Sequence, residues 1–278
     1  MGGNSKVMSL SNSSGNKAFG PLPDPLPKPE GMKHIIAVIS GKGGVGKSTV
    51  SANLAASLLL TGSSVGLLDA DLTGYSQSIL FEQKTDSRQL AAYEPADCYG
   101  IKVASFGFLY PEATTVIWRG PMISNGIKSL FTQTKWGNID YLIIDLPPGT
   151  SDAQLTILRD MPISGGIVVT TPDNLASAVA ERGLRMLFEL KKRVLGIVEN
   201  MSWALCEHCG RVIDIFGAEA GLRLAQKHEI ELLGRIPIDP EMKKAIQLRK
   251  PIVFLSPDSP SSKVFQSIAE ALVRNLRL

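Results

Sequence analysis

The sequence predicts an α/β fold, a mostly parallel β-sheet with helices on both faces, and three observations support this prediction. Apolar, strand-like runs alternate with helix-like patterns from about residue 33 to the end of the chain. The chain has 278 residues, of which 44% are hydrophobic, enough for one sizeable domain with a substantial core. A glycine-rich segment joins the first predicted strand to the first predicted helix. Alternation of this kind is typical of parallel sheets that helices cover on both faces.

Seven apolar runs predict buried strands, and they lie at residues 34–40, 64–69, 101–106, 140–146, 165–171, 194–199 and 231–236. The clearest helical patterns lie at residues 47–61, 173–192 and 261–276. In the first of them Val50, Leu54 and Leu58 fall on one side, which is the spacing of an amphipathic helix. Ligands of such sheets bind at the carboxyl ends of the strands, where the motifs described below fall.

Residues 1–33 differ in composition from the rest of the chain. Asn, Ser and Gly dominate up to about Gly20, and prolines then alternate with other residues from Pro21 to Pro29. Alternating prolines remove N–H donors and favour extended polyproline geometry. We therefore predict a disordered leader at residues 1–33, either an inert tail or a segment that contacts a partner. Residues 34–278 are predicted to form one domain that contains the glycine-rich loop and a cysteine pair.

Composition and charge exclude several classes of protein. The net charge is +3 and no basic block stands out, so nothing in the charge pattern predicts a nucleic-acid partner. No apolar run approaches the ~20 residues of a membrane span, and the polar N-terminus lacks the apolar region of a signal peptide. Lys6 occupies the position where N-myristoylation favours Ser or Thr. With three cysteines and no disulfide framework, the chain is predicted to be cytoplasmic, without membrane partners.

The glycine-rich segment matches a phosphate-binding loop. It reads GKGGVGKST and agrees with the pattern G-x-x-x-x-G-K-[ST] at every fixed position. Free backbone N–H groups and the helix dipole converge on one spot there, and glycines let the backbone approach phosphates closely. Lys47 is expected to neutralise the β- and γ-phosphates, and the hydroxyl of Ser48 to ligate Mg²⁺. The sequence therefore predicts a nucleotide site made by Gly41, Lys42, Gly43, Gly44, Val45, Gly46, Lys47, Ser48 and Thr49.

Acidic residues end two of the predicted strands. Asp145 lies at the end of a buried strand, where a carboxylate is costly unless it meets a cation. Beside a phosphate loop that cation is Mg²⁺, which makes Asp145 a Walker B candidate; a capping aspartate is the alternative. Asp69 and Asp71 end another strand. We expect Asp69 to hold a metal-bound water and Asp71 to orient the attacking water.

Lys42 stands inside the loop at a position where the general motif accepts any residue. The phosphates of the same chain already have Lys47. We therefore predict that Lys42 reaches the nucleotide of a second subunit and supplies charge in trans, as an arginine finger does. A solvated lysine without a role is the alternative. The predicted catalytic residues are thus Lys42, Lys47 and Asp71.

Cys206 and Cys209 form a C-x-x-C pair, whose common interpretations are zinc, a redox dithiol, a disulfide or iron–sulfur ligation. A thioredoxin-like dithiol opens a helix after the first strand, whereas this pair follows the sixth predicted strand. Zinc and clusters both take four ligands, and one chain supplies two at this spacing. Cys98 is interpreted as an ordinary core or loop residue. A two-fold dimer would bring two pairs together, and the same dimer would let Lys42 act in trans.

Together these segments resemble a known family. Lys42 within GKGGVGKST is similar to the signature of the deviant Walker A ATPases, which include MinD, ParA and Get-type proteins. Within that class, residues 30–275 resemble the Mrp/ApbC iron–sulfur carrier ATPases. The segments that carry the resemblance are residues 41–49, 65–71, 116–122, 140–150, 198–202, 206–209, 214–217 and 257–260.

The resemblance implies a homodimer that binds ATP and Mg²⁺, carries a [4Fe–4S] cluster on two C-x-x-C pairs and delivers it to apo-proteins. It also implies that Asn200 contacts adenine and that Pro237 lines the base pocket. A cluster released by a change of nucleotide state would lie near the loops that respond to the nucleotide. The predicted metal residues are Ser48, Asp69 and Asp145 for Mg²⁺, and Cys206 and Cys209 for the cluster.

Two residues depart from the family pattern. Tyr75 stands where the family has proline, and Ser151 stands where it has glycine, both in loops expected to respond to the nucleotide. Residues 1–97 contain no cysteine, so the N-terminal four-cysteine site of the eukaryotic scaffold relatives is missing. One bridging cluster site is therefore predicted.

Two other functions compete with this interpretation. The main alternative is a MinD/ParA-type switch ATPase, regulated by a partner, with a structural zinc or no metal at the cysteine pair. The apolar positions of the last predicted helix look like core packing, and no basic face is evident. A GTP-dependent metallochaperone is disfavoured, because no Asn-Lys-x-Asp motif for reading guanine occurs.

Overall fold

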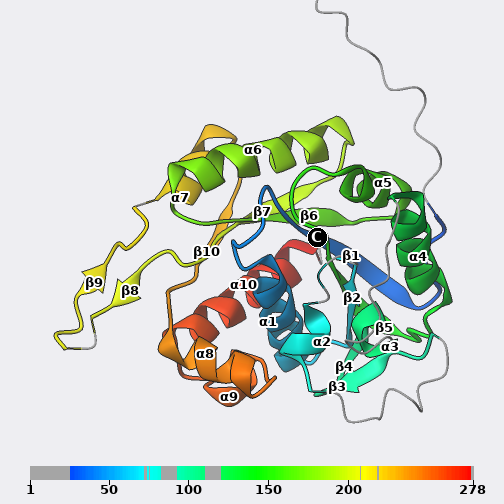
Figure 1. Cartoon of the computed structure of the whole chain (residues 1–278), viewed down its shortest axis with the longest axis horizontal. Coiled ribbons are helices and arrows are strands. Elements are labelled where there is room, and N and C mark those ends of the chain that lie inside the picture. The colour runs from blue at the N-terminus through cyan, green and yellow to red at the C-terminus, as the bar shows by residue number, and fades with distance from the viewer. Residues whose placement is uncertain are drawn as a thin grey trace, which may run out of the picture.

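The fold is an eight-stranded sheet with helices on both faces and one projecting hairpin (Figure 1). The computed structural model describes residues 26–71, 74, 76–82, 93–109, 120–206, 208–217 and 219–276. In chain order its elements are β1 (Met32–Ser40), α1 (Lys47–Leu60), β2 (Val65–Asp69), α2 (Gln77–Leu80), β3 (Ala96–Cys98), β4 (Ile101–Ala104), α3 (Phe106–Leu109), α4 (Gly120–Gln133), β5 (Ile139–Asp145), α5 (Asp152–Asp160), β6 (Gly165–Thr170), α6 (Asn174–Glu189), β7 (Val194–Glu199), β8 (Ala204–Leu205), β9 (Val212–Ile213), α7 (Ala220–Lys227), β10 (Leu232–Arg235), α8 (Pro240–Gln247), α9 (Ile252–Leu255) and α10 (Pro260–Leu276).

The strand order of the large sheet is β10-β7-β6-β1-β5-β2-β4-β3. Every neighbouring pair is parallel except β3 with β4, which is antiparallel. The strand β1 lies in the middle, between β6 and β5, and it leads directly into the phosphate loop. Since the parallel strands all end at the same edge of the sheet, the acidic ends of β2 and β5 lie beside this loop.

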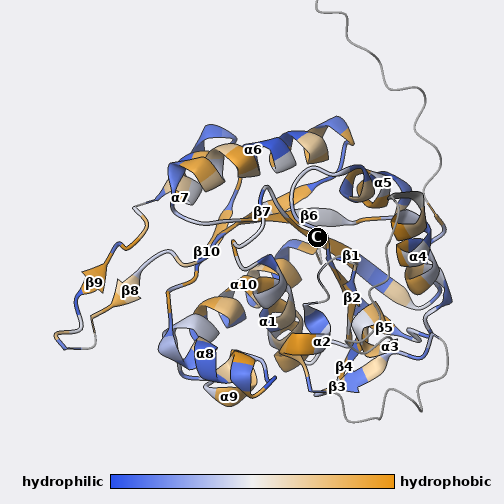
Figure 2. Cartoon of the chain, viewed as in Figure 1, coloured by the Kyte–Doolittle hydropathy of each residue, from blue (hydrophilic) through white to orange (hydrophobic). Residues whose placement is uncertain are grey.

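Two hydrophobic cores cover the two faces of the sheet. Alternate residues of β1 point to opposite faces: Ile36 and Val38 join the core under α1, α9 and α10, while Ile35, Ala37 and Ile39 join the core under α4 to α7. The central strands are almost fully buried, as expected for a parallel sheet. Figure 2 shows hydrophobic colour along β2 and β7 and mixed colour along the covering helices.

The hairpin of β8 and β9 belongs to neither core. It lies between β7 and α7 in the chain and projects from the body at the left of Figure 1. Its base is tied to the body by a parallel bridge between Ala204 and Ile238, and by the N–H of Ile238, which donates to the carbonyl of Trp203 at 2.7 Å. Strands of two residues on an arm of this kind bury little surface.

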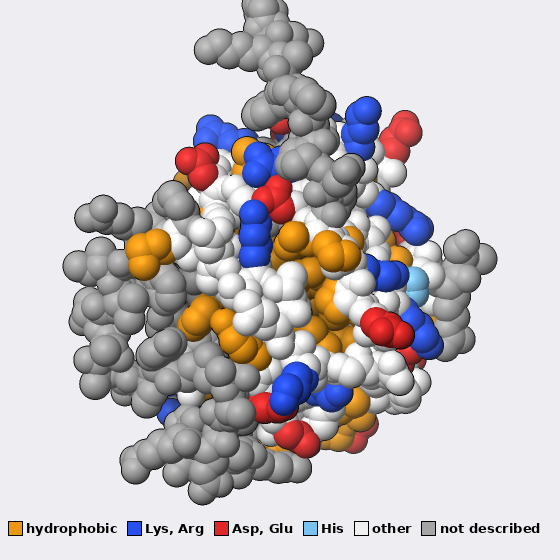
Figure 3. Space-filling view, turned by 90° about the vertical axis from the view of Figure 1, so that its right-hand side faces the viewer, with side chains coloured by type: hydrophobic (Ala, Val, Ile, Leu, Met, Phe, Trp, Pro, Cys, Tyr) orange, Lys and Arg blue, Asp and Glu red, His pale blue; other side chains and the backbone are white. Residues whose placement is uncertain are grey.

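The surface of the body carries charges of both signs. On the face shown in Figure 3, basic and acidic side chains are interspersed around a central group of apolar side chains. Within the described ranges, no helix has both the length and the apolar character required to cross a membrane.

The predicted fold class is confirmed, and all seven predicted strands are present as β1, β2, β4, β5, β6, β7 and β10. The helices predicted at 47–61, 173–192 and 261–276 correspond to α1, α6 and α10. The boundary of the predicted leader differs from the structure. Met32 and Lys33 already belong to β1, and the N–H of Leu26 donates to the carbonyl of Asp160 at 2.6 Å. Residues 1–25 of that leader lie outside the described residues.

Candidate functional site

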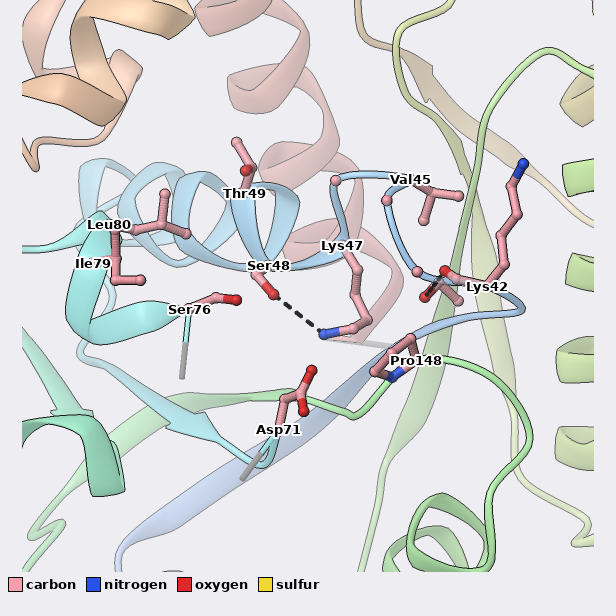
Figure 4. Close-up of a pocket in the computed structure, with 14 residues that line it drawn as sticks. Lys42, Val45, Lys47, Ser48, Thr49, Asp71, Ser76, Ile79, Leu80 and Pro148 are labelled. Carbon is pink, nitrogen blue, oxygen red and sulfur yellow. Dashed lines mark hydrogen bonds between the residues drawn. The ribbon is translucent and has the colours of Figure 1, made fainter. Parts of the chain in front are cut away.

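The phosphate loop forms one wall of a cavity of about 370 Å³ at the carboxyl ends of the central strands (Figure 4). Residues 42–49 line it together with Ser40, Asp71, Ser76, Ile79, Leu80 and Pro148. The helix α1 begins at Lys47, so its unpaired first-turn N–H groups lie at this wall. A cavity walled by backbone donors and a helix N-terminus favours an anionic ligand.

Gly46 is required by the geometry of the loop in two ways. Its φ of 81° lies in the left-handed region, which disfavours side chains. A Cβ at this position would also lie 2.2 Å from Nδ2 of Asn200, too close for any real contact. That amide donates to the carbonyl oxygen of Val45 at 2.9 Å, so the segment after β7 holds the back of the phosphate loop.

Lys47 and Asp145 form a buried ion pair. The ammonium of Lys47 lies 2.5 Å from Oδ1 of Asp145 and 3.4 Å from the hydroxyl of Ser48, and both charged side chains are almost inaccessible to solvent. Figure 4 shows Lys47 pointing toward Ser48 across the floor of the cavity. The lysine therefore places a positive charge between the two groups predicted to hold Mg²⁺. A buried carboxylate requires such a charge.

Asp69 lies next to Asp145 across the β2–β5 ladder, where the two residues are register partners. Burial, and after it the neighbouring Asp145 carboxylate, raise the pKa of Asp69 from 3.8 to about 7, although a hydrogen bond from Ser105 opposes the shift. That hydroxyl donates to Oδ2 of Asp69 at 2.9 Å. The buried position beside Asp145 therefore disfavours the charged form of the Asp69 carboxyl.

Gln77, a residue that the sequence analysis did not identify, completes this buried cluster. Its Nε2 donates to Oδ2 of Asp145 at 2.8 Å and to the carbonyl oxygen of Ser48 at 3.1 Å. Its backbone N–H lies 3.2 Å from Oδ2 of Asp69. No pattern in the sequence marks this glutamine, because its role depends on how α2 packs beneath the cavity.

Asp71 and Lys42 take different positions around the cavity. The carboxyl of Asp71 lines the cavity and points toward Lys47 in Figure 4. Lys42 points away from Lys47 in the same view, and its ammonium lies 3.6 Å from Asp173, the N-cap residue of α6. The lysine is half-exposed, so its charge faces outward from its own phosphate loop.

The structure brings some of the predicted site residues together and leaves others apart. Asp69 and Asp145 lie buried below the cavity and do not line it. Asn200 and Pro237 do not line the described cavity either. The departure at Tyr75 lies outside the described residues, as do residues 116–119 of the family segments. At the second departure, Ser151 is the N-cap of α5, and its hydroxyl accepts the N–H of Gln154.

Cys206 and Cys209 lie at the turn of the hairpin. The N–H of Cys206 donates to the carbonyl of Arg211 at 2.9 Å, and the N–H of Gly210 donates back to the carbonyl of Cys206 at 2.8 Å. Cys209 is exposed, Cys206 is half-buried, and neither forms a disulfide. The hairpin also exposes large apolar side chains, namely Leu205, Val212, Ile213, Ile215 and Phe216.

Within one chain this pair does not lie near the loop of Asp71. The hairpin and α2, which follows that loop, stand well apart in Figure 1. The expected proximity of the cysteines to the nucleotide-responsive loops is therefore wrong for a single chain. The third cysteine, Cys98, is fully buried in the core under α1, as expected.

Glu199, at the end of β7, is a further buried acid, and no role was predicted for it from the sequence. Its carboxylate accepts hydrogen bonds from Ser202 at 2.5 Å, Arg235 at 3.1 Å and the backbone N–H of Gly221 at 2.7 Å. These contacts join β7, β10 and the start of α7 at the root of the hairpin. An acid at the end of a buried strand is the sequence feature that identified Asp145. The same feature could have identified Glu199.

Parallel strand order, a complete phosphate loop and a buried lysine–aspartate pair define a P-loop nucleoside triphosphatase. A family model described as the NUBPL iron-transfer P-loop NTPase, within the ParA group, matches residues 31–273. The chain therefore belongs to the NUBPL iron-transfer P-loop NTPase family, and the resemblance found in the sequence is confirmed.

Individual relatives agree with this assignment. The iron–sulfur cluster carrier protein of Pseudomonas fragi is 40% identical over 255 residues, which cover 90% of this chain and 89% of the relative. A solved nucleotide-binding protein from Archaeoglobus fulgidus, in complex with ADP and with cobalt found in it, is 39% identical with a TM-score of 0.71; the match covers 82% of this chain and 90% of that one. The cell division ATPase MinD of Pyrococcus furiosus is 24% identical with a TM-score of 0.63, over 88% of this chain and 100% of its own, and shares the fold.

Proposed function

We propose that this protein binds and hydrolyses ATP and carries a [4Fe–4S] cluster, held between two copies of the chain, to apo-proteins. The observation that carries the proposal is the union of two sites on one chain. The body contains a phosphate loop with its lysine and acidic partners, and a projecting hairpin carries two cysteines that form no disulfide. The cytoplasm, which keeps thiols reduced, suits such a carrier.

The residues around the cavity fit Mg²⁺ as the cofactor of the nucleotide. The ammonium of Lys47 already lies between the hydroxyl of Ser48 and the carboxylate of Asp145, a position that favours a cation. Mg²⁺ keeps several waters and uses one or two carboxylates, so Ser48, Asp145 and, through water, Asp69 would hold it. Bound there, Mg²⁺ neutralises charge on the phosphates.

The roles of the protein groups in hydrolysis follow from where they point. Lys47 would leave Asp145 for the β- and γ-phosphates, while the backbone N–H groups of residues 43–48 hold the phosphate oxygens. Asp71, at the cavity wall, would orient the water that attacks the γ-phosphate. Lys42 faces away from its own loop, which supports a role at the nucleotide of a partner subunit.

The base of the nucleotide is proposed to lie near Asn200 and Pro237. The amide of Asn200 contacts the carbonyl of Val45, so this side chain borders the phosphate loop. Pro237 lies two residues after the end of β10, which lies beside the end of β7.

The cargo is assigned to Cys206 and Cys209 by their chemistry. A [4Fe–4S] cluster takes four thiolates, and one hairpin offers two. No group of three or more His, Cys, Asp or Glu side chains that could hold a metal ion lies together in the described part of the chain. Two hairpins facing each other would complete the ligand set, and their exposed apolar residues would be covered in the same contact.

Anaerobic reconstitution with iron and sulfide tests the proposal. The wild type should gain absorption near ~400 nm and about two iron atoms per chain, as a shared four-iron cluster requires. The variant Cys206→Ser/Cys209→Ser should gain neither, yet bind ADP as the wild type does, because the hairpin lies apart from the cavity. Equal iron loading of the variant would contradict the proposal.

A second candidate, a switch ATPase with a structural zinc, is favoured by the same pair of thiols, since zinc also takes four such ligands. It predicts stoichiometric zinc of about one per two chains, resistant to air, and no iron-dependent absorption after reconstitution. Metal analysis of protein prepared with and without oxygen separates the two functions.

A further inference from the structure

Gln77 lies in the buried cluster below the cavity, and its side-chain amide makes two hydrogen bonds there. The side chain is fully buried at the first residue of α2. Its Nε2 donates to Oδ2 of Asp145 at 2.8 Å and to the carbonyl oxygen of Ser48 at 3.1 Å. One amide group thus contacts both the carboxylate of Asp145, the Walker B candidate, and the backbone of Ser48, the residue after Lys47.

The two oxygens of Asp145 have different kinds of partner. Oδ1 accepts from the ammonium of Lys47 at 2.5 Å and from the hydroxyl of Ser51 at 3.0 Å. Oδ2 accepts from Gln77. Lys47 has a flexible stem and must move when it contacts phosphates, whereas the glutamine is neutral, buried and fixed at a helix start. Departure of the lysine therefore opens one acceptor position on Oδ1, which keeps its contact with Ser51, and leaves Oδ2 held by Gln77.

We propose that Gln77 is a positioning residue for the metal: it fixes the Asp145 carboxylate through Oδ2, so that Oδ1 is presented to the Mg²⁺ of the bound nucleotide. This inference rests on the proposed binding of Mg²⁺ and nucleotide at the cavity. Partners of metal-ligating carboxylates of this kind orient the ligand and raise the affinity for the metal.

The chemistry of the position supports an orienting role over a purely structural one. Oε1 of Gln77 is buried and has no hydrogen-bond partner among the described residues. An unpaired buried amide oxygen costs free energy, which leucine or methionine of similar size would avoid. The contact to Asp145 is what a polar side chain supplies here and an apolar one cannot.

The test is the Mg²⁺ dependence of nucleotide binding in Gln77→Leu, measured by calorimetry with a non-hydrolysable ATP analogue. The Mg²⁺ concentration that half-maximally tightens binding should rise about tenfold, the loss expected when a partner of a metal ligand is removed. Affinity for the analogue in EDTA should stay within about twofold of wild type, because Gln77 does not line the cavity.

Gln154→Leu is the matched control. Gln154 is also fully buried, and its side-chain amide has no hydrogen-bond partner in the described part of the chain, so this variant makes the same chemical change at a side chain that does not hydrogen-bond to Asp145. It should leave the Mg²⁺ dependence unchanged. Gln77→Met, unbranched like glutamine, replaces Gln77→Leu if the latter does not fold, as judged by its thermal unfolding.

The outcomes separate this inference from the proposed function. If the wild type shows no Mg²⁺-dependent binding of the analogue, the proposed nucleotide chemistry fails and the inference with it. If the wild type shows that dependence and the Gln77 variants share it, the inference alone is overturned. A loss of affinity in EDTA with unchanged Mg²⁺ dependence would also overturn it, because the residue would then support only the shape of the loop.

Discussion

At the scale of single residues, Lys47 explains how a carboxylate can be fully buried at the end of β5. Its ammonium contacts Asp145 at 2.5 Å inside the body, and both side chains are almost inaccessible to solvent. The residue that is proposed to neutralise phosphates therefore also stabilises the fold around the cavity. Both consequences can be measured in one variant.

Lys47→Ala should weaken ADP binding at least tenfold, or by more than ~1.4 kcal/mol, because a desolvated charge contact to the phosphates is lost. It should also lower the free energy of unfolding by about 3–5 kcal/mol, since Asp145 is left buried without its cation. Calorimetry and urea denaturation measure the two effects. Lys128→Ala, which breaks a lysine pair with Asp160 away from the cavity, is the control and should bind ADP normally. An ADP affinity of Lys47→Ala within about twofold of wild type contradicts the assignment.

Asp71→Asn and Lys42→Ala should each lower the rate of ATP hydrolysis, Asp71→Asn by roughly 100-fold or more, as loss of a water-orienting base does. Nucleotide affinity of Asp71→Asn should stay close to wild type. Mixing the two variants tests action in trans. In a mixed dimer, the Lys42→Ala chain keeps its own Asp71 and receives Lys42 from its partner.

When equal amounts of the two variants pair at random, half of the dimers contain one chain of each variant. One of the two sites in such a dimer is complete, so mixing should restore about a quarter of the wild-type rate. If Lys42 acts within its own chain, no site in the mixture is complete and no activity returns. Steady-state phosphate release before and after mixing distinguishes the two results.

At the scale of elements, the long strands could be predicted from sequence and the short ones could not. The strand β1 has six consecutive buried residues and β5 ends in five, so their apolar runs were unmistakable. The strands β8 and β9 have two residues each, too few for any period, and β3 has three. Their existence depends on pairing partners that a local pattern does not contain.

The residues of the candidate site likewise fall into those that could be predicted from the sequence and those that could not. Lys47, Asp69 and Asp145 were found because a glycine motif and the ends of strands mark them. Gln77 and Ser105 contact these carboxylates through packing of α2 and β4, and nothing in their neighbourhood in the sequence indicates this. Motifs locate the groups that face a ligand, while the groups that hold those residues in place depend on tertiary structure.

At the opposite end of the sheet, Asp140 ties three strands together and gives a prediction for pH. Its carboxylate pairs with Lys33 of β1 at 2.7 Å and accepts both the N–H and the hydroxyl of Ser64, just before β2, at 2.8 Å. The Lys33 contact, followed by the Ser64 hydrogen bonds, lowers the pKa of Asp140 from 3.8 to about 2.

A lowered pKa means that the stabilisation is complete above the unfolded value and is lost as the pH falls through the folded one. Asp140→Asn should therefore be less stable than wild type at pH 7, and the difference should shrink between about pH 4 and about pH 2. Urea midpoints of both proteins across this range measure it. A difference that stays constant down to pH 2, or is missing at pH 7, contradicts the assignment.

At the scale of the whole molecule, the nucleotide cavity and the thiols lie in different parts of one chain. The cavity is built into the centre of the sheet, and the hairpin is attached at the periphery (Figure 1). Glu199 and Arg235 lie at the root of that hairpin. Asn200, which follows Glu199 in the sequence, donates a hydrogen bond to the carbonyl of Val45 in the phosphate loop. These contacts form a short connection between the two sites within one chain.

Cluster loading should change the assembly state. Light scattering of the reconstituted wild type should give twice the mass of the chain, because two hairpins are needed for four thiolates. Cys206→Ser/Cys209→Ser treated in the same way should not gain mass. Removal of iron with a chelator should return the wild type to its starting mass, and a loaded protein that stays monomeric contradicts the shared site.

The attachment of the hairpin has a consequence for how such proteins diversify. Residues 203–217 leave the body after β7 and return before α7, and they contribute no strand to the eight-stranded sheet. Exchange of this segment for another of different chemistry would leave the cores and the phosphate loop unaltered. In this architecture the segment that bears the two cysteines can therefore evolve independently of the body that bears the phosphate loop.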